Sequence, residues 1–193
     1  MLIKSLLAFL FSLFLLSCTT NSGGEATSAK NNAVSETGLK DSDLLGFYEA
    51  TDDSTGVKCI LADYSTMHSN FTAMNFYLIV QNSKLVPRIA MSFSEKGHIK
   101  FEKFEIVIKG EEFQFEPKKL FTEKLESGSL IQWAYFPTDS TSLKMLTKLS
   151  TLKTPERYLI TVETEDETFQ TISGSDREYN AIAKTLSLYH KKL

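Results

Sequence analysis

The chain has 193 residues and is mildly acidic, with 24 Asp and Glu, 21 Lys and Arg, and a formal net charge of −3. This balance argues against a nucleic-acid partner, because nucleic-acid-binding domains carry a basic patch or stripe. With 42% hydrophobic residues, fourteen Phe and few Gly and Pro, the composition predicts a folded, β-leaning domain that buries a core of its own.

The N-terminus combines a short positive start with an apolar run. Lys4 precedes the stretch from Leu6 to Leu16, and the sequence Leu15-Leu16-Ser17-Cys18 closes it. The run falls well short of the roughly 20 apolar residues that a membrane-spanning helix needs. It resembles the signal peptide of bacterial lipoproteins, which is cut before a cysteine that carries lipid. The alternative is an ordinary secretory signal that contains a cysteine by chance.

The resemblance implies a cell-envelope protein. Residues 1–17 would be removed, and acyl chains on Cys18 would hold the protein to the membrane, which takes more than one chain to be stable. Thr19 follows the cysteine where an Asp would favour the inner membrane in enterobacteria, so the outer membrane is favoured over the inner. Neither the periplasmic nor the surface face is indicated.

Residues 18–42 are predicted to form a disordered tether after the lipidated cysteine. The stretch is rich in Ser, Thr, Asn and Gly, and only Val34 and Leu39 offer apolar side chains of any size. Such a segment cannot bury enough apolar surface to offset the entropy of ordering. Residues 43–193 are then expected to form a single globular domain.

Segments of alternating apolar and polar residues recur along this domain and predict about eight strands, joined largely as hairpins. Short breaks at 82–84, 109–111 and 165–166 mark hairpin turns. An irregularity in the alternation near Lys103 indicates a bulge. The strand-like segments are 46–50, 57–64, 74–80, 88–93, 99–108, 113–115, 130–136, 158–162 and 168–172.

Two helices interrupt the strands. The first spans about 140–149, with Asp139 or Ser140 as its cap. The second spans about 176–191 and starts at a capping box, in which Ser175 and Glu178 satisfy each other's backbone amides. Together the elements predict a β-rich α+β domain whose mostly antiparallel sheet forms a sandwich or a strongly curved half-barrel.

The candidate chemical groups mostly have structural interpretations. Cys59 lies among apolar neighbours and is predicted to be a buried strand thiol, left without a disulfide partner because Cys18 carries lipid. His68, His98 and His190 are far apart in sequence, and no zinc spacing or catalytic motif is present. The acidic stretch 52–56 lacks the spaced ligands of a calcium loop and is predicted to be a turn. We therefore expect no catalytic residue, metal or cofactor.

Acidic and basic residues alternate around the 99–115 segment. This pattern predicts a solvated strand face with ion pairs, in preference to a pair of catalytic carboxylates. The acidic members are Glu102, Glu105, Glu111, Glu112 and Glu116.

Aromatic side chains provide the candidate binding patch. Tyr77, Trp133, Tyr135 and Phe136 are proposed to line it, since Trp and Tyr anchor many interfaces. The competing interpretation is that Trp133 belongs to the core.

Three functions remain open at this point. The favoured one is a non-catalytic binding or assembly module, tethered to the membrane, with an envelope or surface protein as partner. The second is a carrier of lipid or a small hydrophobic ligand, which requires a large pocket lined by Phe, Met and Leu. The third is a hydrolase, which requires His68 or His98 beside a Ser, Asp or Glu.

Overall fold

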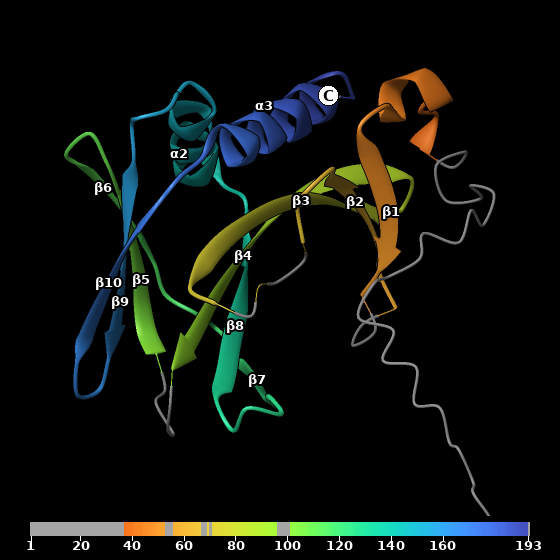
Figure 1. The fold of residues 1–193 in the computed structure, drawn as a ribbon. Coiled ribbons are helices and arrows are strands. Elements are labelled where there is room, and N and C mark those ends of the chain that lie inside the picture. Colours follow the sequence, from red (N-terminus) through yellow and green to blue (C-terminus); the bar gives the residue numbers. More distant parts are fainter. Residues whose placement is uncertain (1–36, 53–55, 67–68, 70, 96–100, 193) are drawn as a thin grey trace, which may run out of the picture. The chain divides into compact units, whose positions relative to one another are not determined.

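The computed structural model describes residues 37–52, 56–66, 69, 71–95 and 101–192 of the protein. Within these residues, ten strands form two antiparallel sheets, accompanied by two α-helices and a short 3-10 helix (Figure 1). The predicted β-rich α+β class with antiparallel pairing is confirmed. The two sheets are open and pack as in a sandwich. They do not close into a barrel.

The larger sheet has six strands. Its spatial order is β1 (Phe47–Thr51), β2 (Lys58–Ala62), β3 (Ala73–Gln81), β4 (Lys84–Glu95), β8 (Leu130–Pro137) and β7 (Phe121–Lys124). The hairpin between β3 and β4 turns at Asn82 and Ser83, which both have positive φ angles (51° and 61°). Two consecutive left-handed residues match the right-handed twist of the flanking strands, so the break in the pattern at 82–84 is the predicted hairpin.

The smaller sheet has four strands. Its order is β10 (Thr168–Ser173), β9 (Tyr158–Thr164), β5 (Phe101–Ile108) and β6 (Glu111–Phe115). Lys109 and Gly110 form the β5–β6 turn, again with positive φ angles (50° and 80°). The pairing register of β5 with β9 shifts between Phe101 and Lys103, at the place where the sequence predicts a bulge.

Two short elements were missed. Strand β7 contains one apolar residue, Phe121, and lies at the sheet edge with its other residues exposed, so no alternation marks it. The 3-10 helix η1 (Asp41–Leu44) begins in the stretch 18–42 that is predicted to be tether and ends in the predicted domain. Leu39 just before it is buried beside Leu188, and the Nζ of Lys192 donates to the carbonyl of Gly38 at 2.7 Å. Packing against the end of the last helix therefore holds this segment.

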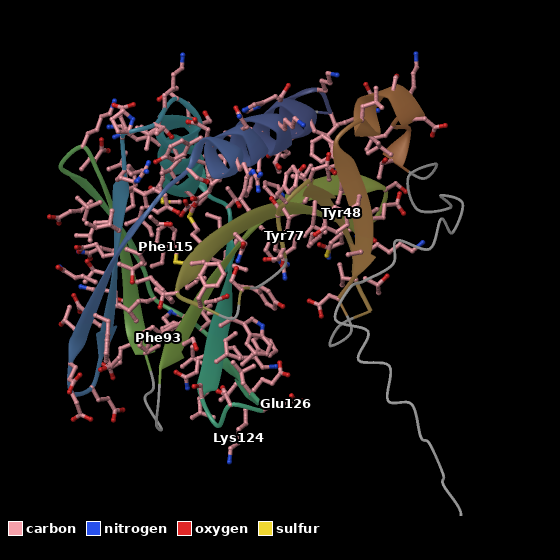
Figure 2. All side chains as sticks on the ribbon, viewed as in Figure 1. Tyr48, Tyr77, Phe93, Phe115, Lys124 and Glu126 are labelled. Atoms are coloured by element: carbon pink, nitrogen blue, oxygen red, sulfur yellow. The ribbon has the colours of Figure 1, made fainter. Side chains whose placement is uncertain are left out.

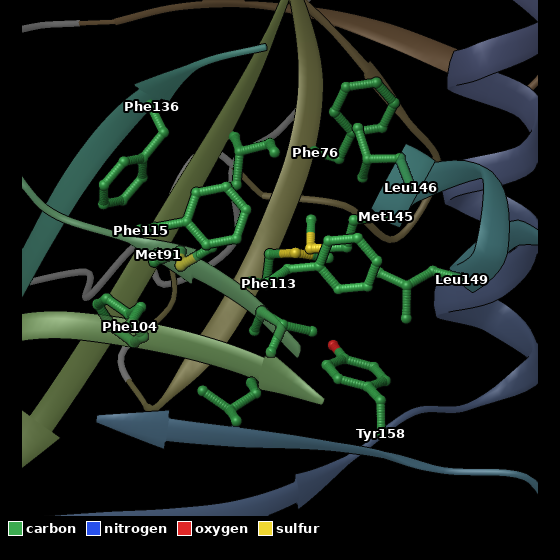
Figure 3. Close-up of a cluster of buried hydrophobic side chains, with 14 of the residues drawn as sticks. Phe76, Met91, Phe104, Phe113, Phe115, Phe136, Met145, Leu146, Leu149 and Tyr158 are labelled. Carbon is green, nitrogen blue, oxygen red and sulfur yellow. The ribbon is translucent and has the colours of Figure 1, made fainter. Parts of the chain in front are cut away.

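The main core lies between the two sheets. Phe93 and Phe115 point into it from β4 and β6, as Figure 2 shows. Figure 3 shows the aromatic and aliphatic side chains of both sheets interleaved with Met145, Leu146 and Leu149 of helix α2 (Ser140–Ser150). Most of these side chains are fully buried, as in a close-packed protein core.

Both helices begin at side-chain caps. The carboxylate of Asp139 accepts the Ser142 N–H at 2.8 Å at the start of α2, which decides between the two predicted caps. Ser175 Oγ accepts the Glu178 N–H at 3.2 Å at the start of α3 (Asp176–His190). Helix α3 packs against β2, β3 and α2, and begins where β10 ends.

Candidate functional site

A surface groove of about 630 Å³ lies between the start of α3, the first half of β3 and the residues that precede β3. Its floor is apolar. Met74 and Phe76 of β3 and Ile182 of α3 line it, and all three belong to the main core. Because the floor consists of packed core residues on a strand and a helix, the groove is formed before any ligand arrives.

Two exposed aromatic rings border the groove. The side chain of Tyr64 is 81% exposed and that of Phe71 is 65% exposed. The guanidinium of Arg177, in the first turn of α3, lies over the ring of Tyr64 with its Cζ 4.9 Å from the ring centroid. This cation–π contact links the segment before β3 to the start of α3.

Hydrogen bonds hold the segment before β3 against the larger sheet. The Ser69 N–H donates to Ser92 Oγ on β4 at 3.0 Å. Asn75 Nδ2 donates to Ser69 Oγ at 3.1 Å, and Thr66 Oγ1 donates to Asn75 Oδ1 at 3.2 Å. The hydroxyl and amide groups on this side of the groove are therefore positioned by the sheet.

Glu178 is the groove residue with the most perturbed environment. Burial raises the pKa of its carboxyl group, although Tyr158 donates its O–H to Glu178 Oε1 and so favours the charged form. Burial also raises the pKa of Tyr158 well above its usual range, so the phenol remains a donor. The groove thus holds a carboxyl group that is more readily protonated than an exposed one.

The sequence identified Glu178 only as a capping residue. The serine half of the predicted capping box is present, and the glutamate side chain reaches Tyr158 on β9. Tyr64, Phe71 and Arg177 carried no signal of their own in the sequence. They come together because β3, β10 and α3 meet at one place in the fold.

Three of the four predicted patch residues, Tyr77, Trp133 and Tyr135, lie together. They are on the face of the larger sheet that points away from the main core. Trp133 Nε1–H donates to Tyr135 Oη at 3.2 Å, and Tyr135 packs against the buried cluster that contains Tyr77. Phe121 of β7, which the sequence did not indicate, stacks on Trp133 with ring centroids 5.6 Å apart. Tyr77 itself is only 1% exposed.

Phe136 does not join the other three. It points to the main core, is 5% exposed and makes an edge contact with Phe115 at 5.5 Å (Figure 3). Neighbouring residues of a strand point to opposite faces, so Tyr135 and Phe136 cannot line the same patch. Tyr77, Phe121, Trp133 and Tyr135 are called the aromatic cluster below.

Two charged side chains, those of Arg88 and Asp52, lie beside Tyr135 of the aromatic cluster. The guanidinium of Arg88 lies 5.7 Å from the centroid of the Tyr135 ring. Burial raises the pKa of Tyr135 to about 12, and the carboxylate beside it on Asp52 adds to the rise. The rings of Phe121, Trp133 and Tyr135 contact one another, so they contribute packing on this face of the sheet.

The remaining candidates have structural roles or lie outside the described residues. Cys59 is 1% exposed, and burial raises the pKa of its thiol to about 11, so it is the buried strand thiol that was predicted. His190 lies in the last turn of α3. Three of the candidates lie outside the described residues: Cys18, His68 and His98. Residues 53–55 of the turn predicted at 52–56 lie outside them as well.

The charged residues around β5 and β6 form ion pairs. Glu111 binds the ammonium of Lys144 at 2.6 Å and also that of Lys148. Lys103 on β5 pairs with Glu163 on β9 at 2.8 Å across the sheet. Of these pairs, Lys103–Glu163 is a cross-strand pair of the kind that the charge alternation predicts, whereas Glu111 pairs with two lysines of helix α2.

Among the described residues, no three His, Cys, Asp or Glu side chains are grouped closely enough to hold a metal ion. No helix in the described part of the chain is both long and apolar enough to cross a membrane. No protein-family model, curated protein or solved structure matches the chain.

Proposed function

We propose that the chain is a bacterial envelope lipoprotein, anchored through acyl chains on Cys18, whose β-rich domain is a non-catalytic binding module. The N-terminal sequence supports the anchor, with its short apolar run and the closing Leu15-Leu16-Ser17-Cys18. Thr19 supports the outer membrane in preference to the inner. The domain is proposed to bind an envelope or surface protein.

The groove is the observation that carries the binding function. Its volume of about 630 Å³ lies in the range of roughly 300–1,000 Å³ that is typical of ligand sites. Tyr64 and Phe71 expose large aromatic surfaces beside an apolar floor, and exposed aromatic residues are the usual anchors of protein interfaces. We propose that the groove receives an apolar or aromatic side chain of the partner protein, with Tyr64 and Phe71 flanking it.

The second candidate function is a carrier of lipid or another small hydrophobic ligand. The volume of the groove supports it as well. The apolar floor of the groove, with Met74, Phe76 and Ile182, would contact such a ligand. The ligand would there meet the carboxyl group of Glu178.

Photo-crosslinking tests the binding function in intact cells. Benzoylphenylalanine replaces Phe71 in the full chain, and the matched control places it at Lys118, which is exposed and does not line the groove. We expect one discrete protein adduct at position 71, weakened when Tyr64 is changed to Ala. Equal adducts at both positions, or none at position 71, would contradict the proposed protein partner.

Two further measurements test the alternative function and the anchor. Native mass spectrometry of the purified full chain would reveal a bound small molecule as an added mass, which the carrier function predicts and the protein-binding function does not. For the anchor, Cys18→Ser should abolish incorporation of labelled palmitate and release the chain from the membrane fraction. A variant that still incorporates palmitate would refute lipidation at Cys18.

A further inference from the structure

Glu178 places a half-buried carboxyl group in the wall of the groove. The buried phenol of Tyr158 on β9 donates its O–H to Glu178 Oε1, so a neutral group holds the carboxyl group in place. The ion pairs in the described part of the chain do not include Glu178. Carboxylates that lose hydration are normally paired with a cation, because the lost hydration is otherwise not offset. The described part of the fold provides no such cation for Glu178.

Arg177 precedes Glu178 in α3 but does not form an ion pair with it. Consecutive residues of a helix do not face each other. The guanidinium of Arg177 lies instead over the ring of Tyr64, with its Cζ 4.9 Å from the ring centroid. This contact also shows that the face of the Tyr64 ring, beside the groove, binds a positive charge.

Aromatic rings line the same groove as the carboxyl group. Phe71 and Tyr64 are exposed beside it, and Phe76 of β3 forms part of its floor. A carboxylate and aromatic faces together suit an organic cation, because both attract its charge while the rings contact its apolar stem. The apolar floor strengthens the attraction, since less water lies between the charges there.

The charged residues at the start of α3 also favour a cation. The first turn carries two acidic residues, Asp176 and Glu178, and one basic residue, Arg177. The carboxylate of Asp176 accepts the Thr154 N–H at 2.9 Å, so it does not replace Glu178 as the groove's carboxylate. A positive side chain of a partner is therefore attracted to this side of the groove, and an acidic one is repelled.

We propose that the partner protein carries a lysine or arginine close to the apolar or aromatic residue that enters the groove, and that this basic side chain binds the carboxylate of Glu178. The inference rests on the proposed protein-binding function of the groove and specifies the chemistry of its partner. The apolar side chain contacts the floor at Met74, Phe76 and Ile182. Both contacts lie in one groove of about 630 Å³, so the two partner residues are close to each other.

Two small probes of similar shape test the charge preference on the purified full chain in detergent. Phenethylammonium carries an aromatic ring and an ammonium group, and phenethyl alcohol has a hydroxyl in place of the ammonium. Methyl NMR of the methionine-labelled chain reports binding through Met74, which lines the groove. Met91 and Met145, which are fully buried in the main core, give the internal reference. A titration of the detergent alone corrects for the probe that enters the micelles.

We expect phenethylammonium to bind about tenfold more tightly than phenethyl alcohol, and Glu178→Gln to remove this difference. The matched control, Glu126→Gln, removes the same charge from an exposed residue that does not line the groove, and should keep the preference. Equal affinities in the wild type, or a preference that survives Glu178→Gln, would overturn the inference and leave the proposed function standing. If neither probe shifts the Met74 signal, the proposed function of the groove fails and the inference fails with it.

Photo-crosslinking in intact cells tests the same carboxylate against the partner protein. With benzoylphenylalanine at position 71, Glu178→Gln should weaken the protein adduct several-fold. Glu178→Lys should abolish it, because like charges would then meet, whereas Glu126→Lys should leave it unchanged. Thermal melts of the full chain identify the variants that are folded. A folded Glu178→Gln variant with an undiminished adduct, or a lipid adduct in place of the protein adduct, would overturn the proposal.

Discussion

Replacing Gly174 with alanine should destabilise the domain strongly, because this glycine meets two separate constraints. Its φ angle is +121°, which side-chain-bearing residues rarely adopt. A Cβ at this position would also overlap the phenol of Tyr179, lying 2.7 Å from its Cζ atom. Tyr179 is 2% exposed and its O–H donates to the Glu156 carbonyl at 2.8 Å, so the ring cannot move aside without losing contacts.

The expected cost combines three effects. The backbone conformation accounts for about 1–3 kcal/mol, displacement of the ring in a packed site for a similar amount, and the lost hydrogen bond for about 1 kcal/mol, so that Gly174→Ala should cost about 3–7 kcal/mol. Urea unfolding followed by the fluorescence of Trp133, the single tryptophan of the chain, measures this loss of stability.

Gly128→Ala is the matched control. Gly128 also has a positive φ angle, +83°, but a Cβ there meets no atom within 4 Å. It should therefore show only the backbone cost, about 1–2 kcal/mol. If Gly174→Ala destabilises no more than Gly128→Ala, the close contact with Tyr179 does not exist in solution and the reasoning is wrong.

Three other variants or treatments test local features. Burial raises the pKa of Glu178 above its ordinary 4.5, so the stability from its tighter proton binding is full below pH 4.5 and declines as the pH rises through the raised pKa. Glu178→Gln keeps an oxygen for the Tyr158 O–H but cannot ionise, so in urea melts it should gain stability relative to the wild type between pH 4 and pH 7. The thiol of Cys59, with its pKa raised to about 11, should react with a disulfide reagent at pH 8 far more slowly in the folded chain than in urea. Asp139→Ala should cost about 1 kcal/mol in the same melts, because it removes the cap on the Ser142 N–H.

Each of these has an outcome that contradicts it. A stability difference between Glu178→Gln and the wild type that does not change with pH would mean that the pKa of Glu178 is not raised. Equal thiol reactivity with and without urea would mean that Cys59 is accessible. For the cap, Asp139→Asn keeps the acceptor oxygen and should lose little, so an equal loss in the Asn and Ala variants would exclude the hydrogen bond as the cause.

Local patterns predicted most of the individual elements. The β5–β6 hairpin follows from alternation on both sides of Lys109-Gly110, and α3 follows from its cap at Ser175 and its apolar stripe. These signals lie within a few residues of the structure that they produce. Strand β7 and η1 carry no such signal, since their conformation depends on β8 and on the end of α3.

The alternation of a strand determines that two neighbouring side chains point to opposite faces of the sheet. It does not determine which of the two faces is covered by other parts of the chain. Tyr135 and Phe136 illustrate this, because both faces of the larger sheet carry packed side chains. The sequence grouped them as one patch, and the structure separates them by a sheet. Phe121 joins Trp133 only because β7 pairs with β8.

The sequence by itself determined the antiparallel β-rich class, the hairpins, the helix caps and the buried character of Cys59, because each follows from residues that are close along the chain. Only the tertiary structure decided where the groove lies. Its floor and walls join Tyr64 and Phe71 to Arg177 and Glu178, which are about a hundred residues further along the chain. These residues meet because α3 packs against the larger sheet. That packing joins residues that are far apart in the chain, so a local sequence pattern does not predict it.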